Sequence, residues 1–122
     1  MTTRTLENFK DMLDTMDANS DEYKAGVGQA IHMVMVGYAY DLPTTTILEI
    51  VPAIAGKMPE NSDTRRGIMR AVEFLEILRE EFPGDADVTD VTARMIVLIE
   101  EYNQKQITKV VMELYPDATQ YT

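Results

Sequence analysis

The stretch DEYKAGVGQAIHMVMVGYAY, residues 21–40, decides the fold of this 122-residue chain. Its second half is apolar on nearly every side, a pattern that is typical of a helix buried at the centre of a bundle. Gly26, Ala30 and Gly37 fall on one stripe of that helix. Because glycine lowers helix stability, its repeated use on one stripe predicts that another backbone packs closely there.

Other helical patterns flank this stretch and are separated by short breaking sequences. They predict helices at about residues 5–18, 46–56, 63–82 and from 87 onward. The pattern Thr46-x-x-Glu49 is a capping box, and Asp87 is the expected cap of the last segment. In that last segment the apolar period slips near Asn103, which predicts a kink or a separate sixth helix. The second apolar stripe consists of Ile107, Val110, Val111 and Leu114.

These patterns predict an all-α fold, a compact single domain of residues 1–122 with five to six helices. The first, fourth and fifth helices are expected to pack around the hydrophobic second helix, and residues 117–122 form a short C-terminal tail. The alternative is an α+β fold with short strands near 44–51 and 107–115, because the sequence Thr44–Leu48 is rich in residues that favour strands.

The charge balance restricts the classes of partner. The chain has 21 acidic and 11 basic residues, a net charge of −10. This charge argues against direct binding to nucleic acid or to anionic membranes, and it attracts a protein with a basic surface. The absence of cysteine excludes disulfides and thiolate zinc sites and fits a cytoplasmic location. No membrane association is expected, because the apolar stretch Val27–Tyr40 is shorter than the roughly 20 residues that a span requires.

An acidic stripe on the first helix is the most distinctive charged feature. Its members recur at steps of three and four, opposite the apolar side of the same helix. Carboxylates at this spacing lie about 5–6 Å apart at their Cβ atoms, close to the phosphate repeat of one nucleic-acid strand. The hypothesis is a protein-binding face that imitates nucleic acid; the alternative is a solvated face. The predicted protein-binding residues are Glu7, Asp11, Asp14, Asp17 and Asp21, joined by Glu73, Glu76 and Glu80.

The predicted fourth helix has its charges opposed to the helix dipole, with arginines near its start and glutamates near its end. One explanation is ion pairing within the chain. The alternative is an anion-binding site in which the free amides at the start of the helix hold a phosphate or carboxylate. The residues of that alternative site are Ser62, Arg65, Arg66 and Arg70.

Catalytic and metal sites find no support in the sequence. Asp17-x-Asn19-x-Asp21 resembles the first half of a calcium loop, but Gly28 stands where the loop needs a bidentate glutamate. His32 is the only histidine, and without a flanking carboxylate it makes a poor ligand set or catalytic base. It is better explained as a core or boundary residue. We therefore expect no metal, no cofactor and no enzymatic activity.

These observations favour a small acidic protein-binding module that docks an acidic helix face on the basic surface of a nucleic-acid-handling partner. The composition suits an inhibitor, adaptor or assembly factor of phage, other viral or bacterial origin. The first alternative is a small-molecule binder that captures a phosphorylated metabolite or signalling nucleotide at the start of the fourth helix. The second is a structural homo-oligomer, since the nine methionines include Met33 and Met35, which cannot both face one partner of the central helix.

Overall fold

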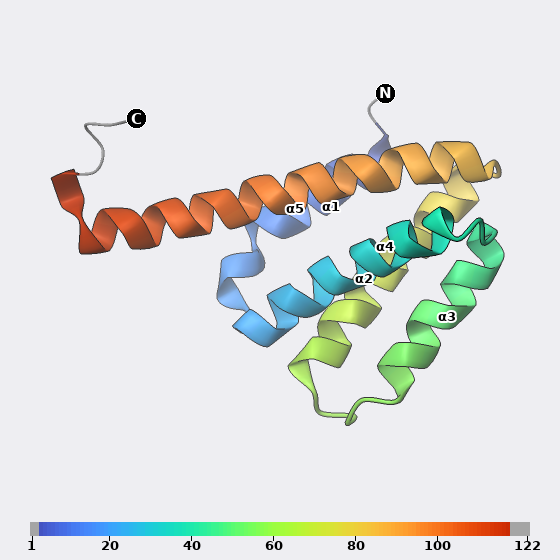
Figure 1. Cartoon of the computed structure of the whole chain (residues 1–122), viewed down its shortest axis with the longest axis horizontal. Helices are drawn as coiled ribbons and strands as arrows, with labels where there is room; N and C mark the ends of the chain where they lie inside the picture. Colours follow the sequence, from blue (N-terminus) through green and yellow to red (C-terminus); the bar gives the residue numbers. More distant parts are fainter. Residues whose placement is uncertain (1–2, 118–122) are drawn as a thin grey trace.

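Two helices cross at the centre of the molecule, and the remaining elements pack around them (Figure 1). The structure is a computed structural model that describes residues 3–117. Within this range it contains five α-helices, one short 3-10 turn and no strand. The elements are α1 (Arg4–Asp14), η1 (Met16–Ala18), α2 (Asp21–Ala39), α3 (Thr44–Gly56), α4 (Asp63–Glu81) and α5 (Asp85–Leu114).

The crossing of α2 and α4 depends on two glycines. A Cβ atom added at Gly26 would lie 2.2 Å from the carbonyl oxygen of Thr64, and one added at Gly67 would lie 2.1 Å from the carbonyl oxygen of Tyr23. Each glycine therefore lets the backbone of the other helix approach where any side chain would collide. The predicted close backbone approach at Gly26 is confirmed, whereas Gly37 admits the side chain of Ile47, 2.6 Å from the position of a Cβ.

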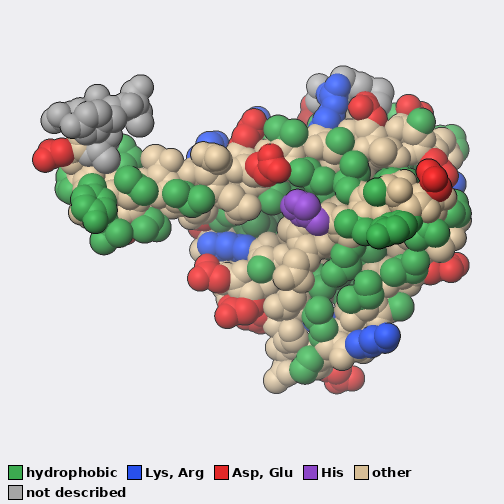
Figure 2. Space-filling view, viewed as in Figure 1, with side chains coloured by type: hydrophobic (Ala, Val, Ile, Leu, Met, Phe, Trp, Pro, Cys, Tyr) green, Lys and Arg blue, Asp and Glu red, His purple; other side chains and the backbone are tan. Residues whose placement is uncertain are grey.

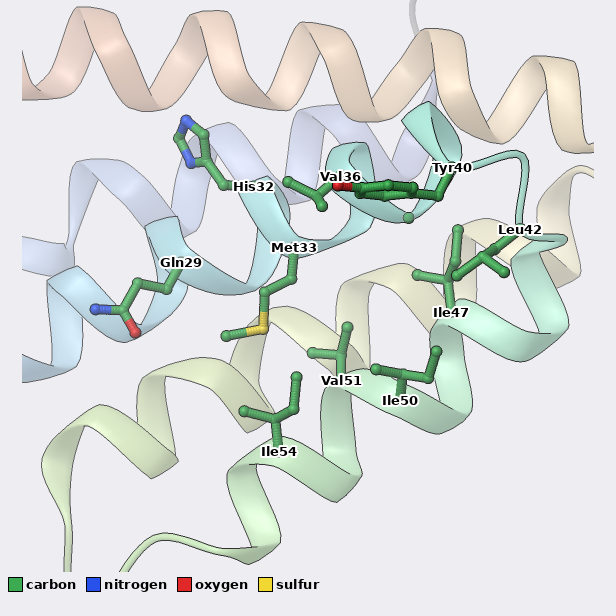
Figure 3. A pocket seen from close by; sticks show the side chains of 11 residues that line it. Gln29, His32, Met33, Val36, Tyr40, Leu42, Ile47, Ile50, Val51 and Ile54 are labelled. Atoms are coloured by element: carbon green, nitrogen blue, oxygen red, sulfur yellow. The ribbon is translucent and has the colours of Figure 1, made fainter.

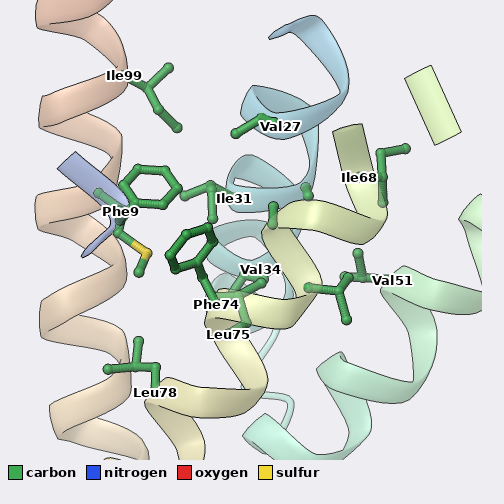
Figure 4. Packing of buried hydrophobic residues seen from close by; sticks show 14 of the residues in the cluster. Phe9, Val27, Ile31, Val34, Val51, Ile68, Phe74, Leu75, Leu78 and Ile99 are labelled. Carbon is green, nitrogen blue, oxygen red and sulfur yellow. The ribbon is translucent and has the colours of Figure 1, made fainter. Parts of the chain in front are cut away.

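The core continues from this crossing to α1, α3 and α5. Phe9 of α1 and Phe74 of α4 pack edge to face, with their ring centroids 5.4 Å apart. As expected, α4 and α5 contact α2 directly, but α1 packs chiefly on α4 and α5. The buried side chains labelled in Figure 4 are Phe9, Val27, Ile31, Val34, Val51, Ile68, Phe74, Leu75, Leu78 and Ile99.

The all-α prediction is confirmed, and the alternative with strands is wrong, because 44–51 lies within α3 and 107–114 within α5. Helix α3 begins at Thr44 behind Pro43, so Thr46 is not its cap. Proline is favourable just before a helix because its φ is already fixed near the helical value. Similarly, α5 begins at Asp85 and not at Asp87. Helix α4 is capped by Ser62, whose hydroxyl accepts a hydrogen bond from the Arg65 amide.

The expected kink or sixth helix near Asn103 is wrong. Helix α5 continues unbroken to Leu114 and projects beyond the other helices (Figure 1). The slip in apolar period is real, but no other helix of residues 3–117 buries the second stripe, so nothing bends α5 toward the core. Ile107 and Leu114 remain 62% and 68% exposed.

Helix α2 is central, as predicted, but it is not buried on every side. Its side chains Val36 and Tyr40 are 54% and 77% exposed. Helix α4 covers one face of α2, while α3 and α5 lie beside it (Figure 1). Among the helices of residues 3–117, none combines the length and the apolar character that crossing a bilayer requires.

The glycine crossing leads to a first prediction. Gly26→Ala and Gly67→Ala should each lower the free energy of unfolding by about 1–3 kcal/mol, because overpacking outweighs the gain of roughly 1 kcal/mol in helix propensity. Gly56→Ala is the matched control, since its Cβ would meet nothing within 4 Å. It should be neutral or stabilising in the same urea denaturation series. Unfolding midpoints of the Gly26 and Gly67 variants at or above that of the unmodified protein would contradict the close approach.

Candidate functional site

An open apolar groove of about 540 Å³ runs between α2 and α3, and Figure 3 shows its side chains. We call it the α2–α3 groove. Met33 and Val36 enter it from α2, while Ile50 and Ile54 face them from α3. The complete set of lining residues is Gln29, His32, Met33, Val36, Gly37, Tyr40, Leu42, Ile47, Ile50, Val51 and Ile54.

None of these residues is aspartate, glutamate, lysine or arginine, although such residues make up 26% of the chain. Three of the large side chains, Val36, Tyr40 and Ile50, are exposed in the groove. An apolar hollow edged by a few polar groups is the usual form of a binding site, and a cluster of exposed apolar side chains on a charged surface marks an interaction site.

A tight turn after α2 positions the two walls of the groove. Asp41 has a φ of 60°, in the left-handed region. The amides of Asp41 and Leu42 donate to the carbonyls of Tyr38 and Gly37 at 3.0 and 3.1 Å. This is a Schellman motif, which satisfies the last carbonyls of α2 and reverses the chain. It brings Leu42 into the groove and returns α3 alongside α2.

The open strip of α2 continues past the α2–α3 groove. A second hollow of about 590 Å³ lies between α2 and α5, and it shares Gln29 and His32 with the groove. His32 was expected in the core or at its boundary, but it is exposed at this junction. Its Nδ1 lies 2.8 Å from the carbonyl oxygen of Gly28, so the ring is oriented by its own helix.

The structure separates the acidic residues that the sequence places on one stripe. Glu7, Asp11 and Asp14 are exposed on the outer face of α1, which ends at Asp14 and not at residue 18. Asp17 lies in η1, beyond the helix. Asp21 is the first residue of α2, where its carboxylate is 3.9 Å from the ammonium group of Lys24.

The glutamates of α4 are exposed on its outer face, where Glu73 forms an ion pair of 2.6 Å with Arg70. Asp11 and Glu73 edge the same hollow between α1 and α4, but Arg70 lies there with them. Glu80 edges a neighbouring hollow together with Arg4 of α1. Basic side chains therefore interrupt the predicted acidic face where α1 meets α4, while Glu76 is exposed further along α4.

The arginines of the alternative anion site donate hydrogen bonds to acceptors within the chain. Nη1 of Arg65 donates to the carbonyl oxygen of Met58 at 3.1 Å. Arg66 is paired with Asp63, and Arg70 lies 4.9 Å above the ring of Phe74 as well as beside Glu73. These contacts account for the arginines near the start of α4 by pairing within the chain, so the anion site stays a prediction without structural support.

Asp17 links η1 to the distant end of α5. Its carboxylate accepts hydrogen bonds from the Tyr102 hydroxyl and, at 3.3 Å, from Nζ of Lys109. These donors hold the pKa of Asp17 below its ordinary value, with the Tyr102 hydrogen bond as the largest cause. Burial and the same hydrogen bond raise the pKa of Tyr102, so its hydroxyl keeps the donated proton.

Comparison with known proteins adds no functional assignment: no family model, no curated protein and no solved structure matches the chain. Among residues 3–117, no group of three or more histidines, aspartates or glutamates is gathered as metal ligands would be. The α2–α3 groove was not predicted from the sequence. The sequence pattern that could have predicted the groove is the helix that is apolar on nearly every side, including Met33 and Val36. Each apolar face of such a helix requires a packing partner.

A second prediction follows from the Asp17 contacts. Tyr102→Phe should raise the pKa of Asp17 toward the ordinary value of about 3.9, because the carboxylate loses its main donor. Since the folded-state pKa is lowered, the stabilisation exists above the ordinary pKa and disappears as the pH falls through the lowered value. The measurement is a carboxyl NMR titration. Tyr115→Phe is the control, because Tyr115 is exposed at the end of α5. An unchanged Asp17 titration in Tyr102→Phe would show that the contact is not formed in solution.

Proposed function

We propose that the protein is a non-enzymatic protein-binding module that seats the apolar face of a partner helix in the α2–α3 groove. The observation that carries the proposal is the composition of the groove: eleven lining residues without a single formal charge, in a chain with a net charge of −10. Charge on the surface keeps such a chain soluble, so a charge-free patch of exposed Val36, Tyr40 and Ile50 is unfavourable unless a partner covers it.

The dimensions of the groove suit a helix. Residues 29–40 of α2 form its length and extend about 18 Å at 1.5 Å per residue. A helix of about three turns matches this length and presents apolar anchors at positions i, i+3, i+4 and i+7. Met33, at the centre of the groove, is flexible and adapts its shape to different apolar side chains.

Charge complementarity defines the rest of the partner. The net charge of −10 attracts a protein whose surface is rich in lysine and arginine. A nucleic-acid-handling protein that this chain inhibits or helps to assemble has such a surface. Glu7, Asp11 and Asp14 keep an exposed acidic face on α1, but no residue of α1 lines the α2–α3 groove. In this proposal the acidic face therefore accelerates association, and the groove determines how long the complex lasts.

A third prediction tests the groove with two matched valines. Val36, in the groove, and Val97, on the outer surface of α5, are 54% and 51% exposed. Val36→Asp should lower the recovery of bound partner about tenfold or more, because docking would bury an unpaired carboxylate. Val97→Asp should leave recovery unchanged. The measurement is affinity capture of partners from cells, quantified by mass spectrometry, with circular dichroism as the test of folding. Equal recovery with both variants would reject the groove as the binding surface.

A fourth prediction concerns the acidic face. Asp11→Lys with Asp14→Lys should slow association with the captured partner and flatten its salt dependence, because the Debye length shrinks from about 30 Å at 0.01 M to about 8 Å at 0.15 M salt. Glu60→Lys with Asp90→Lys changes the net charge equally at exposed sites outside α1. Stopped-flow association rates of the two double variants distinguish an effect of the acidic face on α1 from an effect of the net charge alone. Identical slowing by both pairs would remove the α1 face from the mechanism.

A further inference from the structure

The end of α5 presents an apolar stripe that stays largely exposed among residues 3–117. We call residues 103–114 the α5 tip, and its exposed apolar residues Ile107, Val110, Val111 and Leu114 the tip stripe. The buried residues of α5 end at Ile99. The tip projects from the body, and hydrophobic side chains gather on it in Figure 2.

The exposed tip stripe faces a different direction from the buried side of α5. At about 100° per residue, the stripe is rotated by about 90° from the face that buries Val88, Met95 and Ile99. Only Val110, at the near edge of the stripe, also lines the hollow between α2 and α5. Continuing α5 in a straight line therefore keeps the other members of the stripe away from its own body.

We propose that a second copy of this chain covers the tip stripe, with the α5 tip of each copy lying in the α2–α3 groove of the other. The inference rests on the proposed function, because it requires that the groove binds a helix. The stripe has the spacing i, i+3, i+4 and i+7 that a helix in an apolar groove presents. The stripe from Ile107 to Leu114 extends about 12 Å and fits within the roughly 18 Å of the α2 wall of the groove.

Charge and symmetry support the same occupant. The α5 tip contains Lys105, Lys109 and Glu113, a net charge of +1, which leaves −11 on the rest of the chain. The tip is therefore not acidic, which lessens the local repulsion between two copies that each carry a net charge of −10. In a two-fold symmetric dimer, the same contact between tip and groove occurs twice and covers the tip stripe and the α2–α3 groove of both copies. It also doubles the area that one tip can bury, and stable interfaces bury about 1,200–2,000 Å².

The first part of the test, which is the fifth prediction, measures self-association by sedimentation equilibrium over a range of concentrations. The unmodified chain should form a dimer. Val36→Asp in the groove and Ile107→Asp with Val111→Asp in the tip should each weaken the dimer about tenfold or more, because each buries an unpaired carboxylate. Val97→Asp is the control on the same helix and should dimerise normally. All substituted side chains are exposed, so the monomers should keep their fold by circular dichroism.

The second part mixes the two defective variants. The groove variant keeps an intact tip and the tip variant keeps an intact groove, so one correct contact is restored and a one-to-one heterodimer should form. A chain that stays monomeric at all concentrations would overturn the inference. So would a dimer that survives Val36→Asp but not the tip substitutions, because it would show tips pairing with each other.

The experiments distinguish failure of the proposed dimer from failure of the proposed function. If the chain is monomeric while Val36→Asp still loses its captured partners, the groove binds another protein and only the self-association is wrong. If the reciprocal dimer forms while Val36→Asp and Val97→Asp capture the same partners equally, the dimer is correct and the proposed function is wrong.

Discussion

The contact between the backbones of α2 and α4 is the constraint on which the rest of the structure depends. At Gly26 and Gly67 the absence of a Cβ lets each helix touch a carbonyl of the other. This close crossing fixes the relative orientation of the two longest central helices and buries Val27, Ile31 and Ile68 between their neighbours. With α4 on one face of α2, helices α3 and α5 contact α2 from beside it.

An apolar strip of α2 stays open because of where the other helices pack. Helix α1 packs chiefly on α4 and α5, and α3 returns beside α2 through the turn at Asp41. The chain described here therefore places no helix over the outer surface of α2 between α3 and α5. That surface still carries Met33, Val36 and Tyr40, because the helix is apolar on nearly every side. The groove is the side of α2 that the tertiary fold leaves uncovered, and the projecting end of α5 is a second uncovered surface, on a different helix.

The charges divide into those that pair within the chain and those that remain free to act at a distance. Arg65, Arg66 and Arg70 bond the carbonyl of Met58 and the carboxylates of Asp63 and Glu73. Exposed pairs of this kind contribute little stability, about 0–1 kcal/mol each, but they leave the arginines with acceptors inside the chain. The outer acids of α1 have no such role in the structure described, so the long-range attraction of a basic protein is the property they can supply.

The sequence by itself determined the elements that depend on nearby residues. The apolar period of residues 21–40, the cap at Ser62 and the slip near Asn103 are set within a few turns of helix, and each is present in the structure. Only the tertiary structure decided which apolar face stayed open and which acids found partners. Asp17 meets Lys109 across most of the chain length, and Ile107 stays exposed because no other helix of residues 3–117 reaches the end of α5. Periodicity shows which surface of a helix needs burial, but whether that surface is buried depends on the three-dimensional position of residues distant in the sequence.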